Sequence, residues 1–282
     1  MFALVSAQLC LACAGRPAPS VGSTSVTSPT TTPSGSVRFA KAVVRVEDVR
    51  DAAKFEFDLS KSYETLPPAG VAWFTALDGS SRVLVVAGHA TAQTREGKLK
   101  PVDGGTGALA VMLNRLAKTT TIYTTYASPS DPNFYDDNDF KRAVKKLIEE
   151  RHPRLVLDLH ASHWNHPYDI DFGTMEGRSL LGQTVFLDQL AGRLREEGLA
   201  NFSQDFFAAS KNETITKWVS GMGVPTIQCE INSTWLLPTP DRPKTGAADE
   251  APLPGADAVQ HQRFAELLQG FVRFVATVDA AP

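Results

Sequence analysis

Cysteine is scarce in this sequence. Only three of the 282 residues are Cys, and two of them, Cys10 and Cys13, lie close to the start of the chain. The body of the chain has a single cysteine, Cys229, which excludes a framework of disulfide bonds and a Cys-rich structural zinc site. Any catalytic metal bound by this chain must therefore be held by histidine and carboxylate side chains.

An excess of positive charge is also absent. The 28 Lys and Arg residues are outnumbered by 31 Asp and Glu residues, which gives a formal net charge of −3. Because nucleic-acid-binding domains normally carry a net basic face, we expect no nucleic-acid partner. The sequence also has no Gly-x-Ser-x-Gly motif, the turn that presents the nucleophile of many serine hydrolases. This absence argues against a serine hydrolase.

The start of the chain differs in composition from the rest. Residues 1–14 are apolar and uncharged but too short to span a bilayer, which needs about 20 apolar residues. They resemble the apolar core of a secretory signal, and residues 15–36, rich in Ser, Thr, Pro and Gly, indicate a disordered tether. We therefore expect an exported protein, periplasmic or at the cell surface, with Cys13 as a candidate for a lipid that tethers it to the membrane. If residues 1–14 are not a signal, the chain is cytoplasmic.

Residues 37–282 are expected to form one domain, with an exposed loop near residues 238–255 where Pro, Gly and Asp are frequent. Short, mostly β-branched runs predict strands over residues 42–46, 71–74, 83–87, 121–126, 155–159 and 226–231. Helical patterns cover residues 105–116, 137–151, 179–197, 212–222 and 258–278. Strands that alternate with helices predict an α/β sheet, with ligands at the carboxyl ends of its strands.

Two of the six histidines follow strand-like runs directly. His89 comes after the run 83–87 and a glycine, and His160 comes after the run 155–159. Asp158, two residues before His160, lies on the same strand face and could orient a histidine ring. Glu230 lies within the apolar run 226–231, where a carboxylate is costly unless it is paired or functional.

These residues suit a hydrolytic zinc site. Two histidines, one carboxylate and a water form the usual open coordination of catalytic zinc. The hypothesis is that His89 and His160 bind Zn²⁺ and that Glu230 is the general base, which later protonates the leaving nitrogen. The third ligand stays open between Glu96 and Asp103, since residue 92, where a His-x-x-Glu spacing needs glutamate, is alanine.

The order of these motifs resembles the N-formylglutamate amidohydrolase family, which is similar in fold to the zinc carboxypeptidases. The resemblance runs from about residue 83 to 278 and is carried by Gly88-His89, Asp103-Gly104-Gly105-Thr106-Gly107, Asp131-Pro132-Asn133, Asp158-Leu159-His160-Ala161-Ser162 and Glu230-Ile231-Asn232. It implies a three-layer α/β/α fold with a mixed, mostly parallel central sheet, one zinc, and hydrolysis of a C–N amide bond in an N-acyl amino acid or peptide-like substrate. It also implies that His89 and His160 bind zinc and that Glu230 is catalytic, and it favours Asp103 as the third ligand.

The sequence departs from the family pattern where the substrate is held. Phe134 follows Asn133 at a position where the family commonly has arginine, so the formylglutamate substrate itself is not implied. Arg95 and Arg178 remain candidates for binding a substrate carboxylate, because guanidinium binds carboxylates in a bidentate way. Arg95 could also stabilise the oxyanion.

Two further residues are candidate substrate contacts. Asn133 belongs to the Asp-Pro-Asn motif, and His163 lies in a polar, aromatic loop directly after His160. His163 could assist proton transfer or simply form local hydrogen bonds. The alternative to an enzyme is a non-catalytic exported module that keeps the fold and binds a ligand, which would be favoured if the third metal ligand did not exist.

Overall fold

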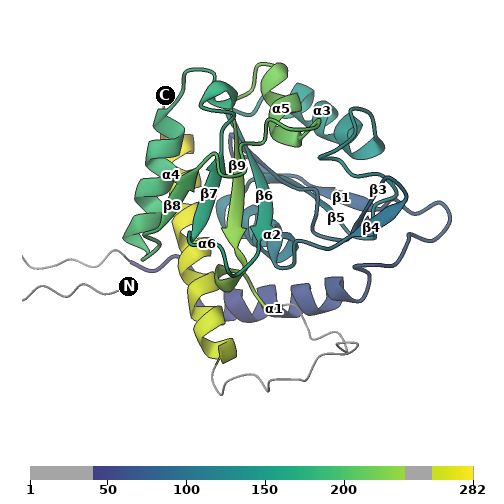
Figure 1. The fold of residues 1–282 in the computed structure, drawn as a ribbon. Coiled ribbons are helices and arrows are strands. Elements are labelled where there is room, and N and C mark those ends of the chain that lie inside the picture. The colour runs from purple at the N-terminus through teal and green to yellow at the C-terminus, as the bar shows by residue number, and fades with distance from the viewer. Residues whose placement is uncertain (1–40, 239–255, 282) are drawn as a thin grey trace, which may run out of the picture. The chain divides into compact units, whose positions relative to one another are not determined.

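The strand-like runs of the sequence form the centre of a three-layer α/β/α structure. The computed structural model describes residues 41–238 and 256–281, which belong to one unit, Lys41–Pro282. Seven strands form one sheet in the order β1-β5-β2-β6-β9-β7-β8 (Figure 1). Their bounds are β1 Phe74–Leu77, β2 Val83–Ala87, β5 Thr120–Thr124, β6 Leu155–Ser162, β7 Ile170–Gly173, β8 Phe202–Gln204 and β9 Thr226–Asn232. A separate antiparallel pair consists of β3 Gln93–Arg95 and β4 Lys98–Lys100.

The sheet is mixed and mostly parallel, as the sequence predicts. Strands β5, β2, β6 and β9 run parallel to one another, while β1 is antiparallel to β5 and β7 is antiparallel to β9. The carboxyl ends of β2, β6 and β9 therefore meet at one edge of the sheet. This edge is where an α/β sheet binds its ligands.

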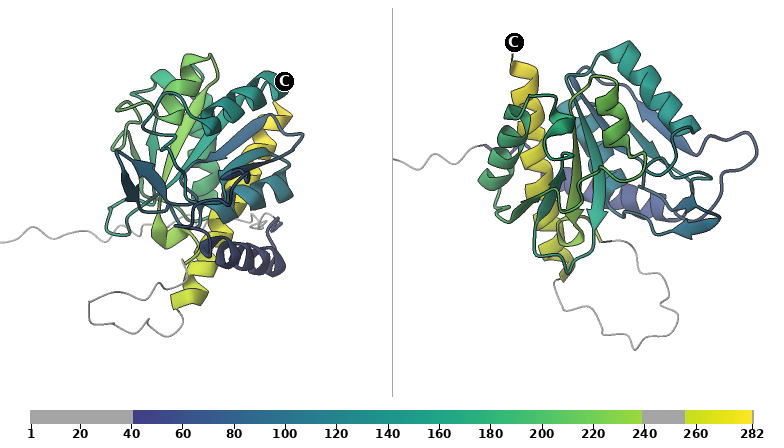
Figure 2. Two further views of the ribbon diagram at one scale, coloured as in Figure 1. Left: turned by 90° about the vertical axis from the view of Figure 1, so that its right-hand side faces the viewer. Right: turned by 45° about the horizontal axis from the view of Figure 1, so that its top comes forward.

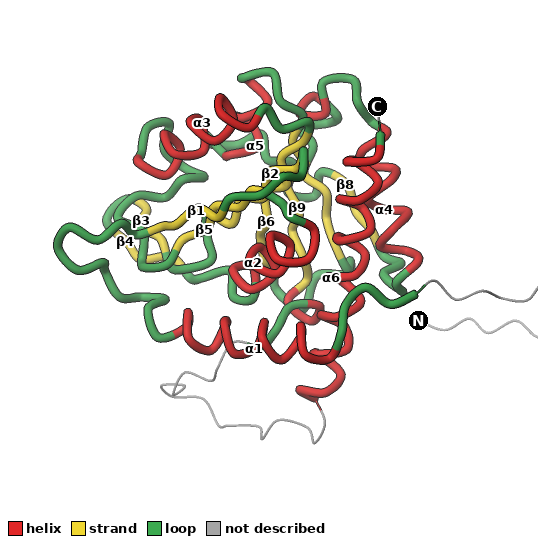
Figure 3. The backbone as a smooth tube through the Cα atoms, turned by 180° about the vertical axis from the view of Figure 1, so that it is seen from behind, coloured by secondary structure: helices red, strands yellow, loops and turns green. Residues whose placement is uncertain are grey.

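Helices cover both faces of the sheet (Figures 1 and 3). Helices α3 (Asp139–Arg151) and α5 (Ile215–Gly221) pack on one face, and the views of Figure 2 keep them apart from α1. The other face is covered by α1 (Val46–Ser60), α2 (Thr106–Ala117), α4 (Val185–Glu196) and α6 (Ala256–Ala280). Two short 3₁₀ helices, Arg178–Leu180 and Ser233–Trp235, complete the regular structure of the described residues.

Alternation along the central strands divides the core in two. In β2, Val83, Val85 and Ala87 pack toward α1, α2, α4 and α6, whereas Leu84 and Val86 pack toward α3 and α5. All five side chains are buried, because helices cover both faces of the strand. In β6, Val156 packs toward α3 and α5, and the same alternation places Asp158 and His160 on that face of the sheet.

One predicted strand is absent, and the strand predicted over 71–74 overlaps β1 only at Phe74. Residues 42–46 form no strand: 42–45 are irregular, and α1 begins at Val46. The helical period follows the β-branched run: Asp48, Val49, Ala52, Glu56 and Leu59 are the buried positions of α1.

Three expectations fall outside the described residues: the signal over 1–14, the tether over 15–36, and the loop near 238–255 from residue 239 onward. Among the helices that are described, none is both long and apolar enough to cross a membrane.

Candidate active site

The carboxyl edge of the sheet brings the chemically important residues together. His89 follows β2, His160 belongs to β6, and Glu230 belongs to β9 directly opposite His160 in the parallel register. Asp103 lies in the loop before α2, and its backbone N–H donates to the His89 carbonyl. Both histidines are buried, so this cluster forms part of the protein interior at the bottom of a pocket.

His89, Asp103 and His160 form a candidate metal centre. Asp103 Oδ2 lies 2.8 Å from His160 Nδ1 and 3.4 Å from His89 Nδ1. One ligand atom from each of the three residues lies within 4.8 Å of the others, and among the described residues no other group of His, Cys, Asp and Glu meets this condition. Glu96 is exposed at the turn between β3 and β4, outside this group.

The far sides of both rings face carboxylates. His89 Nε2 lies 2.9 Å from Asp131 Oδ1, and His160 Nε2 lies 3.3 Å from Asp158 Oδ1. For His89 this contact places a proton on Nε2 and leaves the Nδ1 lone pair for a metal, the usual arrangement of metal-binding histidines. His160 Nε2 also faces the Asn133 amide nitrogen at 2.9 Å, and the Nδ1 atoms of both rings face Asp103. Two Nδ1 atoms and one carboxylate oxygen therefore fit a zinc ion, with a fourth position left for water.

Asp131 lies beside the candidate metal ligands and contacts His89, Arg95 and Asn133. It is completely buried, and its Oδ2 accepts hydrogen bonds from Arg95 Nε and Nη2 at 2.8 and 2.6 Å. The backbone N–H of Asn133 donates to Oδ1, the oxygen that also faces His89. The candidate residues from the sequence did not include Asp131, although the Asp-Pro-Asn motif that contains it could have indicated it.

Opposite charges in the centre shift the pKa values strongly. Burial lowers the pKa of His89, but hydrogen bonds to Asp103 and Asp131 outweigh it and raise the pKa to about 9. Burial likewise opposes ionisation of Asp103, yet the two histidines hold its pKa at about 2. The carboxylates of Asp103 and Asp131 therefore stay ionised at neutral pH, and the cluster favours a cation between its ligand atoms.

Glu230 has the properties of a general base. Its side chain is half-buried and lines the same pocket as His89, Asp103 and His160. Burial raises the pKa of Glu230 to about 7, with the charge of His160 acting against this shift and that of Asp103 adding to it. A carboxylate with a pKa near neutrality can both accept and return a proton at working pH. Gln228 Nε2 donates to Glu230 Oε1 at 3.0 Å and so fixes its orientation.

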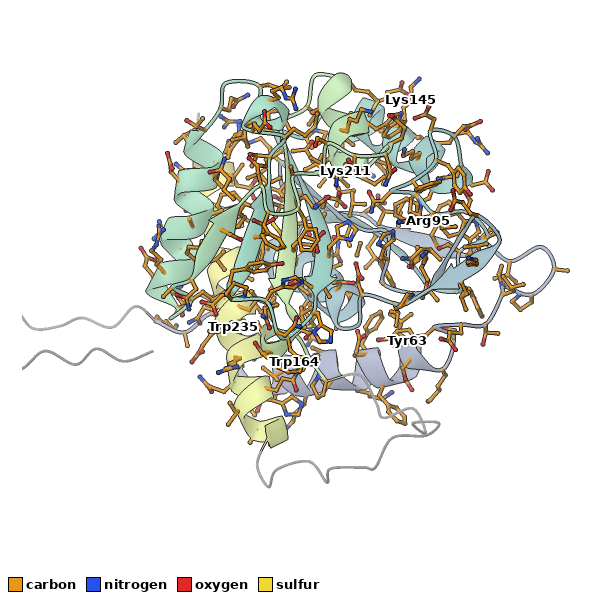
Figure 4. All side chains as sticks on the ribbon, viewed as in Figure 1. Tyr63, Arg95, Lys145, Trp164, Lys211 and Trp235 are labelled. Atoms are coloured by element: carbon orange, nitrogen blue, oxygen red, sulfur yellow. The ribbon has the colours of Figure 1, made fainter. Side chains whose placement is uncertain are left out.

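The pocket has a volume of about 680 Å³ and a cationic wall. Arg95 of β3, Lys100 of β4 and Lys211 of the loop before α5 line it, and Arg95 and Lys211 are labelled in Figure 4. The same loop contributes Phe206 and Phe207, two large apolar side chains. Sequence reasoning missed Lys100, Lys211, Gln228 and the two phenylalanines, because nothing local marks them as neighbours of the histidines.

The predicted substrate contacts occupy different places. Arg95 and Asn133 line the pocket, but both also hold protein groups: Arg95 donates to Asp131, and Asn133 Oδ1 accepts from the backbone N–H of Ile215 at 2.7 Å. Asn133 Nδ2 lies 2.9 Å from His160 Nε2.

The other two predicted contacts lie outside the pocket lining. His163 is exposed, and its Nδ1 lies 2.8 Å from Asn165 Oδ1. Its neighbour Trp164 lies well away from Arg95 and Lys211 in Figure 4. Arg178 is also exposed, and its Nε donates to the Met175 carbonyl. The structure therefore gives neither residue a place in this site.

Comparison with known proteins gives matches among solved structures alone. No protein-family model and no curated protein matches the sequence. The chain is similar to N-formylglutamate amidohydrolase from Ralstonia eutropha JMP134, at 15% identity and a TM-score of 0.45, over 72% of this chain and 99% of that one. A bacteriophage poly-gamma-glutamate hydrolase gives 14% identity and a TM-score of 0.44, over 75% of this chain and 93% of that one. A metallo-carboxypeptidase from Burkholderia cenocepacia gives 9% identity and a TM-score of 0.42, over 74% of this chain and 66% of that one.

The family that the sequence resembles is thus among the structural neighbours, which are hydrolases. These values describe a distant likeness, so the chemistry of this chain rests on the residues of its own site.

Proposed function

We propose that this chain is a zinc-dependent hydrolase that cleaves the C–N amide bond of an N-acyl amino acid or peptide-like substrate. The observation that carries the proposal is the convergence of His89, Asp103 and His160 within 4.8 Å, in a pocket that Glu230 shares. Two histidines and a carboxylate are the protein ligands of many hydrolytic zinc sites, and a nearby glutamate is the base that such chemistry needs.

The residues of the chain have distinct roles in this reaction. Bound zinc would supply a Lewis acid and lower the pKa of water toward neutrality. Asp131 holds the His89 ring so that Nδ1 faces the metal position, and Asp158 and Asn133 lie beside Nε2 of His160. Glu230 accepts a proton as the water oxygen bonds to the carbonyl carbon, and it gives that proton to the nitrogen when the C–N bond breaks. The products are a carboxylic acid and an amine.

The cationic wall supports a substrate that carries a carboxylate. Arg95 and Lys100 line the pocket from the β3–β4 pair, and Lys211 lines it from the loop before α5. Since Asp131 already holds the Arg95 guanidinium, the two lysines are the stronger candidates for contact with a substrate anion. This differs from the sequence-based hypothesis, which gave that role to Arg95 and Arg178.

The proposal is tested by comparing wild type with Glu230→Gln. Wild type should bind about one zinc and hydrolyse N-acyl amino acids or short peptides, and a chelator should abolish this activity. The variant should keep its zinc but lose about 100-fold or more in kcat, because it lacks the proton acceptor. Metal analysis of both proteins and a substrate screen measure these outcomes.

Two results would contradict the proposal. Full activity of Glu230→Gln would remove Glu230 as the base. Failure of wild type to bind zinc would favour the non-catalytic ligand-binding module instead.

We also propose that the enzyme acts outside the cytoplasm, on an amide of the cell envelope. The support is compositional: the apolar residues 1–14 and the Ser/Thr/Pro-rich residues 15–36. Fractionation of cells that express the full chain with a C-terminal tag should place it in the exported or membrane fraction. Recovery in the cytoplasm at full length would contradict this.

A further inference from the structure

Two exposed aromatic rings stand on the wall of the pocket. Phe206 and Phe207, here called the aromatic ledge, follow β8 and are 60% and 39% exposed. Their ring centroids lie 5.0 Å apart, and the His166 ring lies 5.4 Å from each. Large apolar side chains that remain exposed beside a pocket commonly contact a ligand. Their exposure to water does not stabilise the free protein, whereas their burial by a ligand stabilises the complex.

The backbone beneath the aromatic ledge is held firmly. The buried carboxylate of Asp171 accepts hydrogen bonds from the backbone N–H groups of Phe206 and Phe207, at 3.1 and 2.8 Å, and from Ser203 Oγ at 2.7 Å. The next carbonyl, that of Ala208, accepts from the Met175 N–H. A buried carboxylate with several donors therefore fixes the loop while both rings face outward, which is the design of a preformed binding surface.

A single side chain connects the aromatic ledge to the proposed base. Gln228 Nε2 donates both to the Phe207 carbonyl at 3.2 Å and to Glu230 Oε1 at 3.0 Å. The Gln228 amide therefore bridges the Phe207 backbone and the Glu230 carboxylate, which would act on the scissile bond. The residues that carry the rings and the proposed base line the same pocket.

The polar atoms near the rings are already used. The Asp205 carboxylate, just before the ledge, accepts from the Thr174 and Glu176 N–H groups at 2.6 and 3.0 Å. Ala208 and Ala209 continue the pocket lining after it. The ledge is therefore an apolar part of the lining, within a loop that also contributes Lys211, while Arg95 and Lys100 lie on the β3–β4 pair.

We propose that the aromatic ledge is a specificity subsite for a large apolar or aromatic side chain beside the scissile amide. The substrate class is then an N-acyl amino acid or short peptide that has such a side chain and a free carboxylate. This inference rests on the proposed amide hydrolysis, because the ledge is assigned to the same substrate.

Binding and hydrolysis are measured separately to test it. The probes are N-acetyl-L-phenylalanine and N-acetyl-L-alanine, titrated calorimetrically into zinc-loaded Glu230→Gln protein. The phenylalanine derivative should bind about tenfold or more tightly, since it buries a benzyl group on the rings. Adding Phe206→Ala and Phe207→Ala should reduce this preference to near unity. The matched control is Trp164→Ala, which removes an aromatic side chain that is 65% exposed but outside the pocket lining, and it should keep the preference.

Equal affinity for the two probes, absence of binding by the phenylalanine derivative, or a preference that survives loss of both rings would overturn the proposed subsite. A clear, ring-dependent preference in a protein whose wild type hydrolyses no amide would leave the subsite standing and refute the proposed activity.

Discussion

Asp131 determines how His89 can bind a metal, although it is not itself a ligand. One oxygen of its carboxylate faces His89 Nε2 and the other binds Arg95. Rotation of the His89 ring would therefore break its contact with the buried Asp131 carboxylate. Arg95 is held over the Phe134 ring, with its guanidinium carbon 4.9 Å from the ring centre. The phenylalanine that departs from the family pattern thus supports the arginine that fixes Asp131.

The substitution Asp131→Asn tests this role. The amide can present a donor to His89 Nε2 and removes the charge that favours the correct ring state, so zinc affinity should fall by about 10- to 100-fold. Competition with a zinc-binding dye measures the change. Asp137→Asn is a suitable control, because its exposed carboxylate pairs with Arg142 on the surface and should leave zinc affinity unaltered. Equal affinity of Asp131→Asn and wild type would refute the positioning role.

The proximity of residues at the carboxyl ends of strands was predictable, and the approach of distant loops was not. His89, His160 and Glu230 lie together because each follows or lies within an apolar run, and parallel strands bring these ends to one edge of the sheet. His163 lies outside the pocket lining because β6 ends at Ser162, after which residues 163–165 are exposed. Lys211 reaches the pocket from a distant loop, and sequence spacing contains no information on that approach.

Helix α1 supports the loop that carries Asp103. Its Glu56 is buried and accepts hydrogen bonds from the N–H groups of Gly105 and Ala108 at 2.6 and 3.1 Å, and also from the Tyr63 hydroxyl. Gly105 precedes α2 with a φ of 85° and no side-chain cap of its own. Glu56 therefore caps α2 from another helix, two residues beyond Asp103. No element was predicted for residues 47–60, so this cap could not be found from the sequence.

The protonation of Glu56 should make stability depend on pH. Burial raises its pKa to about 7 from 4.5, although the Gly105 and Ala108 hydrogen bonds act against the shift. The folded chain thus binds this proton more tightly than the unfolded chain. The resulting stabilisation is complete below pH 4.5 and is lost as the pH rises through about 7. The shift corresponds to about 3 kcal/mol of unfolding free energy.

Glu56→Gln removes the titrating group. Its unfolding free energy relative to wild type should therefore increase by up to about 3 kcal/mol between about pH 5 and pH 8. Urea unfolding of both chains in the presence of a chelator measures this difference. Tyr63→Phe, which keeps the carboxyl group, should retain the pH dependence of wild type. A Glu56→Gln difference that is constant with pH would show that Glu56 does not titrate in this way.

At the scale of the whole molecule, the site joins the neighbouring parallel strands β2 and β6 with the loop before α2. The metal group takes one residue after β2, one from the loop before α2, and one from β6. Alternating strand and helix patterns predicted an α/β sheet, and the family resemblance implied the three layers and the mostly parallel strands. The order of strands at the β7–β8 edge was not predictable, because these strands are short and β8 is only partly buried.

Zinc should therefore stabilise the entire domain and not the pocket alone. A ligand that binds only the folded state, at about 1,000 times its dissociation constant, adds about 4 kcal/mol. For a domain of this size, such a gain raises Tm by about 8–16 °C. Thermal unfolding with zinc and with excess chelator measures the shift. His160→Ala removes a ligand from β6 and should abolish most of the shift, and Mg²⁺ should not replace zinc, because it prefers oxygen ligands. A shift that persists in His160→Ala would mean that zinc binds elsewhere, since the ligand atoms of the remaining pair, His89 and Asp103, cannot hold the ion as tightly as three.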